Sequence, residues 1–240
     1  MTKRKLQRFA EMETFDHVIQ PAFEEVFDKD FRLKGAWNKT FFKHSQPLVL
    51  ELGCGKGEYT VGLAKRFPNK NFLGIDIKGS RMWRGAKTIE EEHLSNAGFL
   101  RTRIDFVASL FAPKEVDEIW ITFPDPQPKK SLKRLTSTRF LERYVRFLKP
   151  GGLIHLKTDN QDLHLYTKAL VKKNKFQVLE AYQDLYASDY AEEFLEIKTF
   201  YERQFLEEGK PITYLRFVPE HRETFEEPDG EGEHFFSTSL

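Results

Sequence analysis

The chain has 240 residues, 40% of them hydrophobic, which is enough for one large domain with a sizeable core. Its formal net charge of +1 does not by itself indicate a polyanionic partner, and its single cysteine, Cys54, excludes an intrachain disulfide and a CxxC zinc site. The sequence contains no run of 18 apolar residues and no signal-peptide pattern. We therefore expect a soluble protein of the cytoplasm with no membrane partner.

The pattern of the chain divides it into three parts, 1–47, 48–218 and 219–240. Residues 1–20 are basic and then mixed, with little apolar periodicity before Phe15, and we expect them to form a mobile arm. The remainder of the first part is expected to form a short helix beginning at Pro21 and a loop through Gly35–Trp37. The last part is an acidic tail, and its charges mask basic residues elsewhere in the net count.

The stretch LVLELGCGKG, residues 48–57, organises the second part. The apolar run at 48–50 predicts a buried strand at 48–52, and the ten residues after the glycines, 58–67, have helical spacing. Three glycines lie between them: Gly53, Gly55 and Gly57. Glycine accepts positive φ, and because it has no Cβ, a ligand can come close to its backbone. A strand, a glycine turn and a helix together place a nucleotide-like ligand at a helix N-terminus. A second strand at 71–76 ends in Asp76, which is suitably placed to accept hydrogen bonds from two ribose hydroxyls.

After Asp76 the chain alternates between predicted helices and strands. Helices are predicted at 80–96, with Ser80 as N-cap, and at 136–148, 161–173 and 190–207. Strands are predicted at 99–104, 118–123, 153–157, 176–181 and 212–218. Alternation of this kind predicts a doubly wound α/β sheet.

Acidic side chains collect where the predicted strands end. Ligands of doubly wound sheets bind beyond the carboxyl ends of the strands. The acids expected at that edge are Glu51, Asp76, Asp105, Asp125 and Asp159. For Asp105, which follows the third strand, a helix N-cap is the alternative interpretation.

The stretch FPDPQPKK, residues 123–130, follows the fourth predicted strand. Prolines on both sides of Asp125 restrict the backbone and hold this carboxylate at the mouth of the expected site. Basic residues continue through 129–149 and can contact phosphates: Lys129, Lys130, Lys133, Arg134, Arg139, Arg143, Arg146 and Lys149. The alternative is a proline-rich loop beside a solvated basic helix face.

Four motifs give the chain a family resemblance. LELGCGKG, FPDP followed by lysines, LKTDN with Asp159, and the stretch Thr199–Glu202 together resemble the bacterial tRNA (guanine-N7)-methyltransferases of the TrmB family. The resemblance covers about 45–218. Two positions depart from it, because Gln127-Pro128 stands where many members have Trp-His, and Asp76 replaces a commoner glutamate.

The resemblance implies a class I S-adenosylmethionine (AdoMet) methyltransferase fold, a Rossmann-like doubly wound sheet of seven strands with the last strand antiparallel. Residues 48–218 would form the methyltransferase domain. The activity implied is methyl transfer to N7 of a guanosine in the tRNA variable loop, position 46 in tRNA numbering, by a monomer or homodimer. The implied AdoMet contacts are Glu51, the three loop glycines, Asp76, Asp105 and Asp125, with Asp125 also catalytic. The implied substrate contacts are Lys129, Asp159, Thr199, Phe200, Tyr201 and Glu202.

Guanine N7 carries a lone pair and no proton, so its methylation needs no general base, and we expect the protein to supply mainly alignment. Asp125 or Asp159 would stabilise the positive charge that develops on the ring or accept from guanine N1–H and N2–H. Three other interpretations stay open at this point: an AdoMet methyltransferase for a small molecule or protein, a nicotinamide oxidoreductase, and a non-catalytic RNA-binding module. The histidines show no HxH or HExxH spacing, so we expect no metal site.

Overall fold

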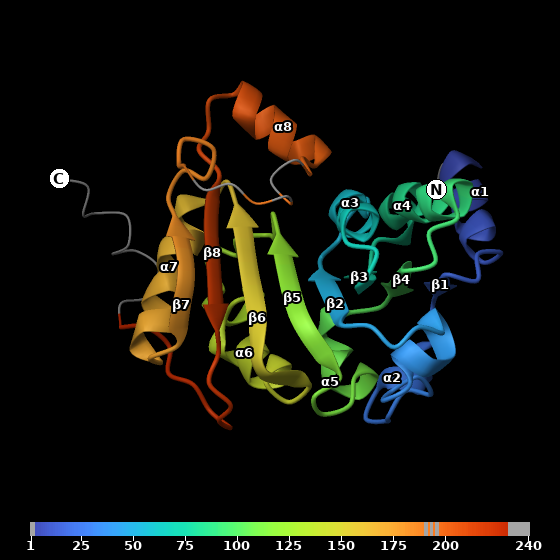
Figure 1. Cartoon of the computed structure of the whole chain (residues 1–240), viewed down its shortest axis with the longest axis horizontal. Helices are drawn as coiled ribbons and strands as arrows, with labels where there is room; N and C mark the ends of the chain where they lie inside the picture. The colour runs from blue at the N-terminus through green and yellow to red at the C-terminus, as the bar shows by residue number, and fades with distance from the viewer. Residues whose placement is uncertain (1–2, 190–191, 193, 195–196, 230–240) are drawn as a thin grey trace.

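The computed structural model describes residues 3–189, 192, 194 and 197–229, and an eight-stranded sheet runs through its centre (Figure 1). The strands are β1 (Val18–Ile19), β2 (Leu48–Leu52), β3 (Asn71–Asp76), β4 (Ala97–Arg101), β5 (Val116–Thr122), β6 (Leu148–Thr158), β7 (Gln177–Tyr182) and β8 (Thr213–Val218). Their order across the sheet is β1-β4-β3-β2-β5-β6-β8-β7. Neighbouring strands from β1 to β6 pair in parallel, and β8 is antiparallel to both β6 and β7.

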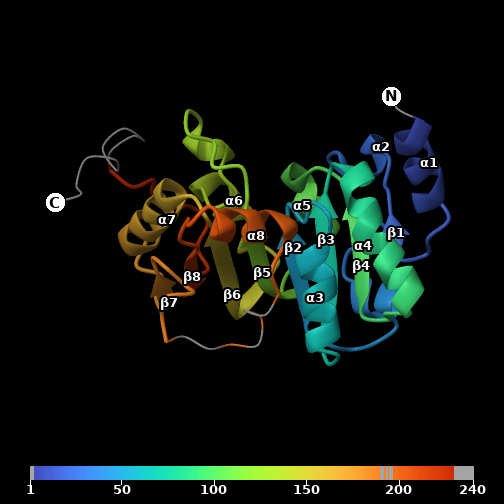
Figure 2. The ribbon, with the colours of Figure 1, turned by 90° about the horizontal axis from the view of Figure 1, so that it is seen from above.

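Helices cover both faces of the sheet. Seen from above, α3 and α4 lie on one side of the strands, and α5, α6 and α7 lie on the other (Figure 2). The helices are α1 (Lys3–Met12), α2 (Phe23–Val26), α3 (Glu58–Arg66), α4 (Gly79–Glu92), α5 (Val107–Leu110), α6 (Thr138–Tyr144), α7 (Gln161–Lys173) and α8 (Phe200–Glu207). Two clusters of buried apolar side chains fill the two interlayer spaces. The architecture is therefore a three-layer α/β sandwich.

Strand β2 shows why the sequence places the site where it does. All five of its residues are buried, because it pairs in parallel with β3 on one side and β5 on the other and is covered on both faces. A strand in this position reads as a continuous apolar run, and the polar residue within it, Glu51, needs partners inside the protein. The chain then turns at the carboxyl edge of the sheet, where the glycines follow.

The predicted doubly wound sheet with its last strand antiparallel is confirmed, since β8 inserts between β6 and β7. The sheet has one strand more than predicted. Val18 pairs with Phe99, and Phe99 N donates to His17 O at 2.9 Å, which adds β1 outside β4.

The expected mobile arm is wrong for the residues that the structure describes, because residues 3–12 form α1. This helix packs against α4, where Glu11 accepts hydrogen bonds from Trp83 Nε1 at 2.7 Å and Lys87 Nζ at 2.8 Å. Met12 is fully buried. Six of the ten residues of this helix are polar, and the hydrogen bonds of Glu11 that help to hold it are contacts that apolar periodicity does not reveal.

Two further expectations near the N-terminus need correction. The predicted helix from Pro21 is only the four-residue α2, and the loop expected at Gly35–Trp37 leads into a π-helix at Trp37–Phe42. Trp37 is fully buried, and its Nε1 donates to Leu110 O at 2.9 Å. The indole N–H of this buried side chain bonds to a carbonyl that is distant in sequence. That contact fixes a local conformation that a turn pattern cannot indicate.

Several predicted helices are shorter than expected. The helix predicted at 80–96 begins at Gly79 rather than after an N-cap at Ser80, and it ends at Glu92, where His93 adopts a φ of +53°. Of the helix predicted at 136–148, only the residues of α6 are helical, and β6 already begins at Leu148. The helix predicted at 190–207 is wrong over residues 197–199, and its residues 190–191, 193 and 195–196 lie outside the described part.

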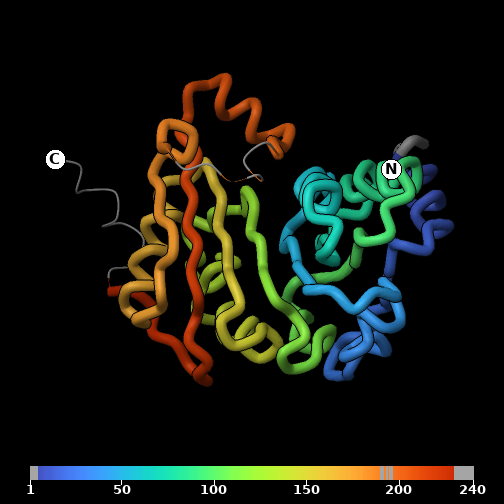
Figure 3. The backbone as a smooth tube through the Cα atoms, in the orientation of Figure 1, coloured from blue at the N-terminus to red at the C-terminus, as the bar shows by residue number. Residues whose placement is uncertain are grey.

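The acidic stretch after β8 packs on the protein as far as residue 229 and runs beside α7 (Figure 3). Glu227 accepts hydrogen bonds from Thr138 N at 3.1 Å, Thr138 Oγ1 at 2.7 Å and Tyr166 OH at 2.6 Å. Phe225 is buried nearby. The carboxylate therefore caps the start of α6 from 89 positions further along the chain. The expected tail beyond residue 229 lies outside the described residues.

None of the described helices has the length and apolar content that crossing a bilayer requires. Within the same described residues, His, Cys, Asp and Glu side chains form no group of three that could hold a metal ion.

Candidate active site

A cavity of about 680 Å³ opens at the carboxyl ends of the central strands. Its walls come from the glycine loop (residues 53–57), the end of β3, the loop of residues 123–128 (the FPDP loop), the residues after β6, and α8. Predicted site residues on its walls are Glu51, Gly53, Gly55, Asp76, Asp125, Asp159, Thr199 and Tyr201. A second cavity of about 520 Å³ adjoins it, shares Asp76 and Gln127 with it, and is lined by Asp105.

Gly53 and Gly55 present bare backbone to the cavity. Their φ values are +81° and +54°, and Gly53 N donates to Ile75 O at 2.8 Å, which holds the loop against the end of β3. A Cβ at Gly55 would meet only Gly53 O, at 4.0 Å, so it would project into open space. A ligand can therefore approach this backbone closely.

Gly57, predicted to contact the cofactor, does not line the cavity. A Cβ at this position would lie 2.2 Å from Phe99 Cζ and 3.4 Å from Gly85 Cα, and the residue is the N-cap of α3 at a φ of +73°. Its glycine identity is therefore explained by close packing of the loop against α4 and β4 rather than by a ligand.

We expect Gly57→Ala to lower the free energy of unfolding by about 3 kcal/mol, because a left-handed alanine costs about 1–2 kcal/mol and the overlap with Phe99 adds about 1–3 kcal/mol. Gly151→Ala is the matched control. Gly151 has a φ of +78°, but a Cβ there would meet no atom within 4 Å, so only the backbone cost remains. Chemical denaturation of both variants measures the difference, and equal losses would refute the packing role.

Asp76 closes the glycine loop onto the end of β3. Its Oδ2 accepts from Gly55 N at 3.0 Å, and its Oδ1 accepts from Lys78 N at 2.8 Å. Each carboxylate oxygen can accept a second hydrogen bond, and the side chain lines both cavities. The two backbone donors orient the carboxylate for diol hydroxyls before any ligand arrives.

Glu51 is buried beneath the glycine loop. Its Oε2 accepts from Thr60 N at 2.8 Å and from Thr60 Oγ1, and its Oε1 accepts from Thr122 Oγ1 at 2.5 Å. Burial raises its pKa to about 7, and the hydrogen bonds from the two threonines oppose that rise. The carboxyl group thus connects β2, α3 and β5 directly under the cavity floor.

This raised pKa predicts a pH-dependent stability. The unfolded chain ionises Glu51 near pH 4.5, whereas the folded protein keeps it protonated up to about pH 7, so stability from this group is present below pH 4.5 and lost as pH rises to 7. The shift corresponds to about 3 kcal/mol. We expect Glu51→Gln to remove that fall, measured as the difference in unfolding free energy between pH 4.5 and 8 for variant and wild type. Parallel pH profiles for the two proteins would contradict it.

Asp105 lies in a ring of arginines beside the second cavity. Its Oδ1 lies 2.9 Å from Arg139 Nη2 and 3.5 Å from Arg143 Nη1, and its Oδ2 lies 3.7 Å from Arg103 Nη2. It sits within the short 3₁₀ turn at Ile104–Phe106, for which Arg103 is the N-cap. The alternative interpretation as a helix N-cap is therefore wrong.

The FPDP loop holds Asp125 at the cavity mouth through an unusual backbone. Phe123 and Gln127, on either side, both adopt positive φ, +47° and +46°. Phe123 N donates to Lys157 O at 2.8 Å, and Asp125 Oδ1 accepts from Gln127 N at 3.1 Å. The two prolines predicted a fixed loop. The left-handed backbone of Phe123 and Gln127 could not be predicted, because neither residue is a glycine.

The end of β6 supplies a half-buried carboxylate, Asp159. Burial raises its pKa, and the nearby Lys210 opposes the rise. The backbone beside it is fixed, because Thr158 Oγ1 accepts from Asn160 N at 3.1 Å. Asp125 and Asp159 therefore face one cavity from two adjacent strand ends, as predicted.

Three predicted substrate residues do not line either cavity. Lys129 is exposed beyond the FPDP loop. Phe200 is 46% exposed, and Lys56 Nζ lies 3.7 Å from its ring centroid. Glu202 is fully buried behind the cavity wall, so its expected direct contact with a substrate needs correction.

The walls also include residues that the sequence did not single out. Thr122 and Asn160 are polar residues at the carboxyl ends of β5 and β6, and the rule that selected the acids would also have selected them. Leu135 and Phe205 carry no such signal, because an apolar residue in a polar stretch is more often core than ligand contact.

The comparisons with known proteins agree with this geometry. A family described as "Putative methyltransferase" matches residues 45–215. A protein of Christiangramia forsetii named tRNA (guanine-N(7)-)-methyltransferase is 55% identical over 219 residues, which are 90% of this chain and 98% of that protein. One of the same name from Bacteroides thetaiotaomicron is 49% identical over 96% of this chain and 92% of its own length. The chain belongs to the tRNA (guanine-N7)-methyltransferase family.

Solved structures support the fold of this methyltransferase family member. The 16S rRNA methyltransferase KamB superposes with a TM-score of 0.56 at 15% identity, over 73% of this chain and 89% of that one. The 16S rRNA (adenine(1408)-N(1))-methyltransferase from Catenulisporales acidiphilia gives a TM-score of 0.53 at 15% identity, over 78% and 94%. At this identity the likeness concerns the fold alone, which is the class I Rossmann-like methyltransferase fold.

Proposed function

We propose that this chain methylates N7 of the guanosine at position 46, in the variable loop of tRNA. As a family member the chain is an AdoMet-dependent tRNA (guanine-N7)-methyltransferase, with relatives of that name at 55% and 49% identity over most of its length. The observation that carries the proposal is one cavity in which the glycine loop, Asp76, Asp125 and Asp159 converge. We further propose that the protein works in the cytoplasm as a monomer or homodimer, with residues 48–218 as its catalytic domain.

AdoMet supplies an activated methyl group on a positively charged sulfur. The residues present fit this cosubstrate, because Gly53 and Gly55 leave room along the backbone and Asp76 offers two oriented oxygens for ribose hydroxyls. We propose that Asp105 serves the adenine side, from the second cavity that adjoins Asp76. Glu51 supports the loop from below through Thr60 and Thr122 rather than reaching far into the cavity.

On the guanine side, the protein needs no base, since N7 has no proton to remove. Asp125 and Asp159 are proposed to act on the ring by charge: one carboxylate stabilises the positive charge that methylation creates, and the other accepts from N1–H or N2–H. Thr199 and Tyr201 on α8 complete the wall opposite. The exposed side chains of Lys129 and Phe200 lie outside the cavity and are proposed to meet the tRNA backbone and bases around the target.

The test is transfer of labelled methyl from AdoMet to unmodified bulk tRNA, followed by nuclease mapping and nucleoside identification. We expect N7-methylguanosine at position 46. Label at another tRNA nucleoside would keep the fold and cosubstrate and overturn the proposed position. Binding of AdoMet with no transfer to tRNA would favour a small-molecule or protein substrate.

A further inference from the structure

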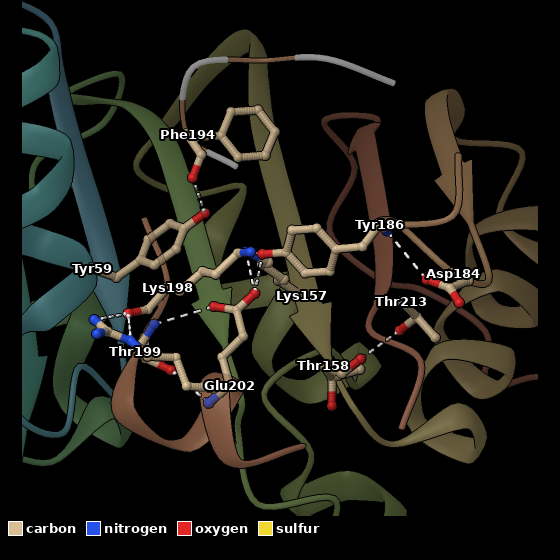
Figure 4. Close-up of polar contacts among 11 residues, drawn as sticks. Tyr59, Lys157, Thr158, Asp184, Tyr186, Phe194, Lys198, Thr199, Glu202 and Thr213 are labelled. Atoms are coloured by element: carbon tan, nitrogen blue, oxygen red, sulfur yellow. Dashed lines mark hydrogen bonds and ion pairs between the residues drawn. The ribbon is translucent and has the colours of Figure 1, made fainter. Parts of the chain in front are cut away.

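Glu202 and Lys157 form an ion pair that is closed to solvent. Both side chains have zero exposure, and Lys157 Nζ lies 2.6 Å from Glu202 Oε1. Tyr186 OH donates to the same oxygen at 2.5 Å and accepts from Lys157 Nζ at 3.1 Å (Figure 4). Glu202 Oε2 accepts from Thr199 N at 3.2 Å, which completes the capping box at the start of α8. Both carboxylate oxygens are thus bonded to the protein itself.

Such a pair contributes little net stability, because desolvating two charges costs as much as their attraction returns. Burial lowers the pKa of Lys157, and the adjacent Glu202 opposes that change. The pair instead fixes the position of α8. The Glu202 carboxylate can bond to Lys157, Tyr186 and Thr199 together in only one placement of α8 on the end of β6.

Helix α8 lies over the carboxyl ends of β5 and β6 (Figures 1 and 2). It reaches both loops of the cavity. Phe200 N donates to Glu58 Oε2 at 3.1 Å beside the glycine loop, and the Phe205 ring lies 6.0 Å from that of Phe123 in the FPDP loop. Thr199 and Tyr201 line the cavity between these contacts.

We propose that Glu202 is a positioning residue for methyl transfer: it anchors α8 on Lys157 and thereby holds Thr199 and Tyr201 on the cavity wall, without touching guanine. The effect on catalysis that this inference predicts rests on the proposed function. Its structural part, the anchoring of α8, stands on the contacts alone and has its own measurement.

The two roles are separated by removing both charges. If Glu202 contacted guanine, the activity lost in its variant would stay lost when Lys157 is also changed. An anchoring pair, in contrast, can be replaced by uncharged side chains of similar size.

We expect Glu202→Gln and Lys157→Met each to lower kcat/KM for tRNA by at least about tenfold, since small displacements of the residues on the cavity wall cost that much. The double variant Glu202→Gln/Lys157→Met should recover to within about threefold of wild type. Glu207→Gln is the control, because Glu207 is an exposed glutamate of the same helix, and it should leave kcat/KM unchanged.

Amide hydrogen exchange over residues 200–207 measures the anchoring without any substrate. Exchange should rise in each single variant, return in the double variant, and rise in Tyr186→Phe, which loses only one hydroxyl and stays folded. A double variant as inactive as Glu202→Gln, or unchanged exchange in Tyr186→Phe, would overturn the inference. Wild-type protein that transfers no methyl to tRNA would instead overturn the proposed function, while the exchange series would still decide the anchoring.

Discussion

Asp125→Ala should lower kcat for methyl transfer to tRNA by about 1,000-fold, the effect of removing one preorganised charge from the transition state. Its carboxylate faces the cavity between Pro124 and Pro126, fixed by the hydrogen bond from Gln127 N. Because the side chain is exposed, we expect the free energy of unfolding to stay within about 0.5 kcal/mol of wild type. Single-turnover assays with saturating AdoMet, together with direct AdoMet binding, measure the two effects separately.

Two controls make this result specific. Asp125→Asn keeps an acceptor for Gln127 N and removes only the charge, so a loss as large as that of alanine assigns the effect to charge. Asp30→Ala removes an exposed carboxylate of the same kind, paired with Lys34 away from the cavity, and should be neutral. Turnover of the alanine variant at the wild-type rate would end the role assigned to Asp125.

Asp76→Ala should raise the Kd for AdoMet by about 1,000-fold. Two hydrogen bonds from ribose hydroxyls to a carboxylate contribute about 2 kcal/mol each, and their joint loss converts to that factor. The variant also releases Gly55 N and Lys78 N, so the glycine loop loses its tie to the end of β3. Isothermal titration calorimetry with AdoMet measures the change.

The control for this variant is Asp76→Glu, which restores the residue commoner in the resembling family. It keeps the charge and lengthens the side chain by one methylene, so we expect a Kd within about tenfold of wild type. If alanine and glutamate weaken binding equally, reach and not charge decides the site. An alanine variant that binds AdoMet normally would show that the ribose lies elsewhere.

The sequence predicted the elements whose signal is local. Strand β2 opens with the apolar run at 48–50, and α7 starts at Gln161 as expected because Asn160 Oδ1 accepts from Leu163 N at 2.8 Å. Turns fixed by glycine or proline, such as the glycine loop and the FPDP loop, were also located. Since parallel strands end at one edge, the convergence of Asp76, Asp125 and Asp159 followed from element order alone.

The rest depended on contacts between distant residues. Gly57 looks like a ligand-binding glycine until Phe99, 42 positions later, is seen to fill its Cβ space. Glu202 looks like an exposed helix residue until Lys157 and Tyr186 enclose it. Helix α1 looks like a basic arm until its Glu11 is seen to bond to Trp83 and Lys87 of α4. None of these partners is near in sequence, so no local pattern could indicate them.

The arginine ring around Asp105 changes how the basic stretch 129–149 meets a polyanion. Counterions are released from RNA only by cations that are free to replace them, and each replaced counterion adds close to one unit to the slope of log affinity against log salt. Four of the eight basic residues have partners: Arg139 and Arg143 share Asp105, Lys149 pairs with Asp117, and Arg134 lies over the Tyr166 ring, where it keeps its full charge. Lys129, Lys130 and Lys133 of this stretch are exposed. Asp105 and Asp117 together cancel about two of the eight positive charges of this stretch, so the salt dependence of tRNA binding should reflect about six of them.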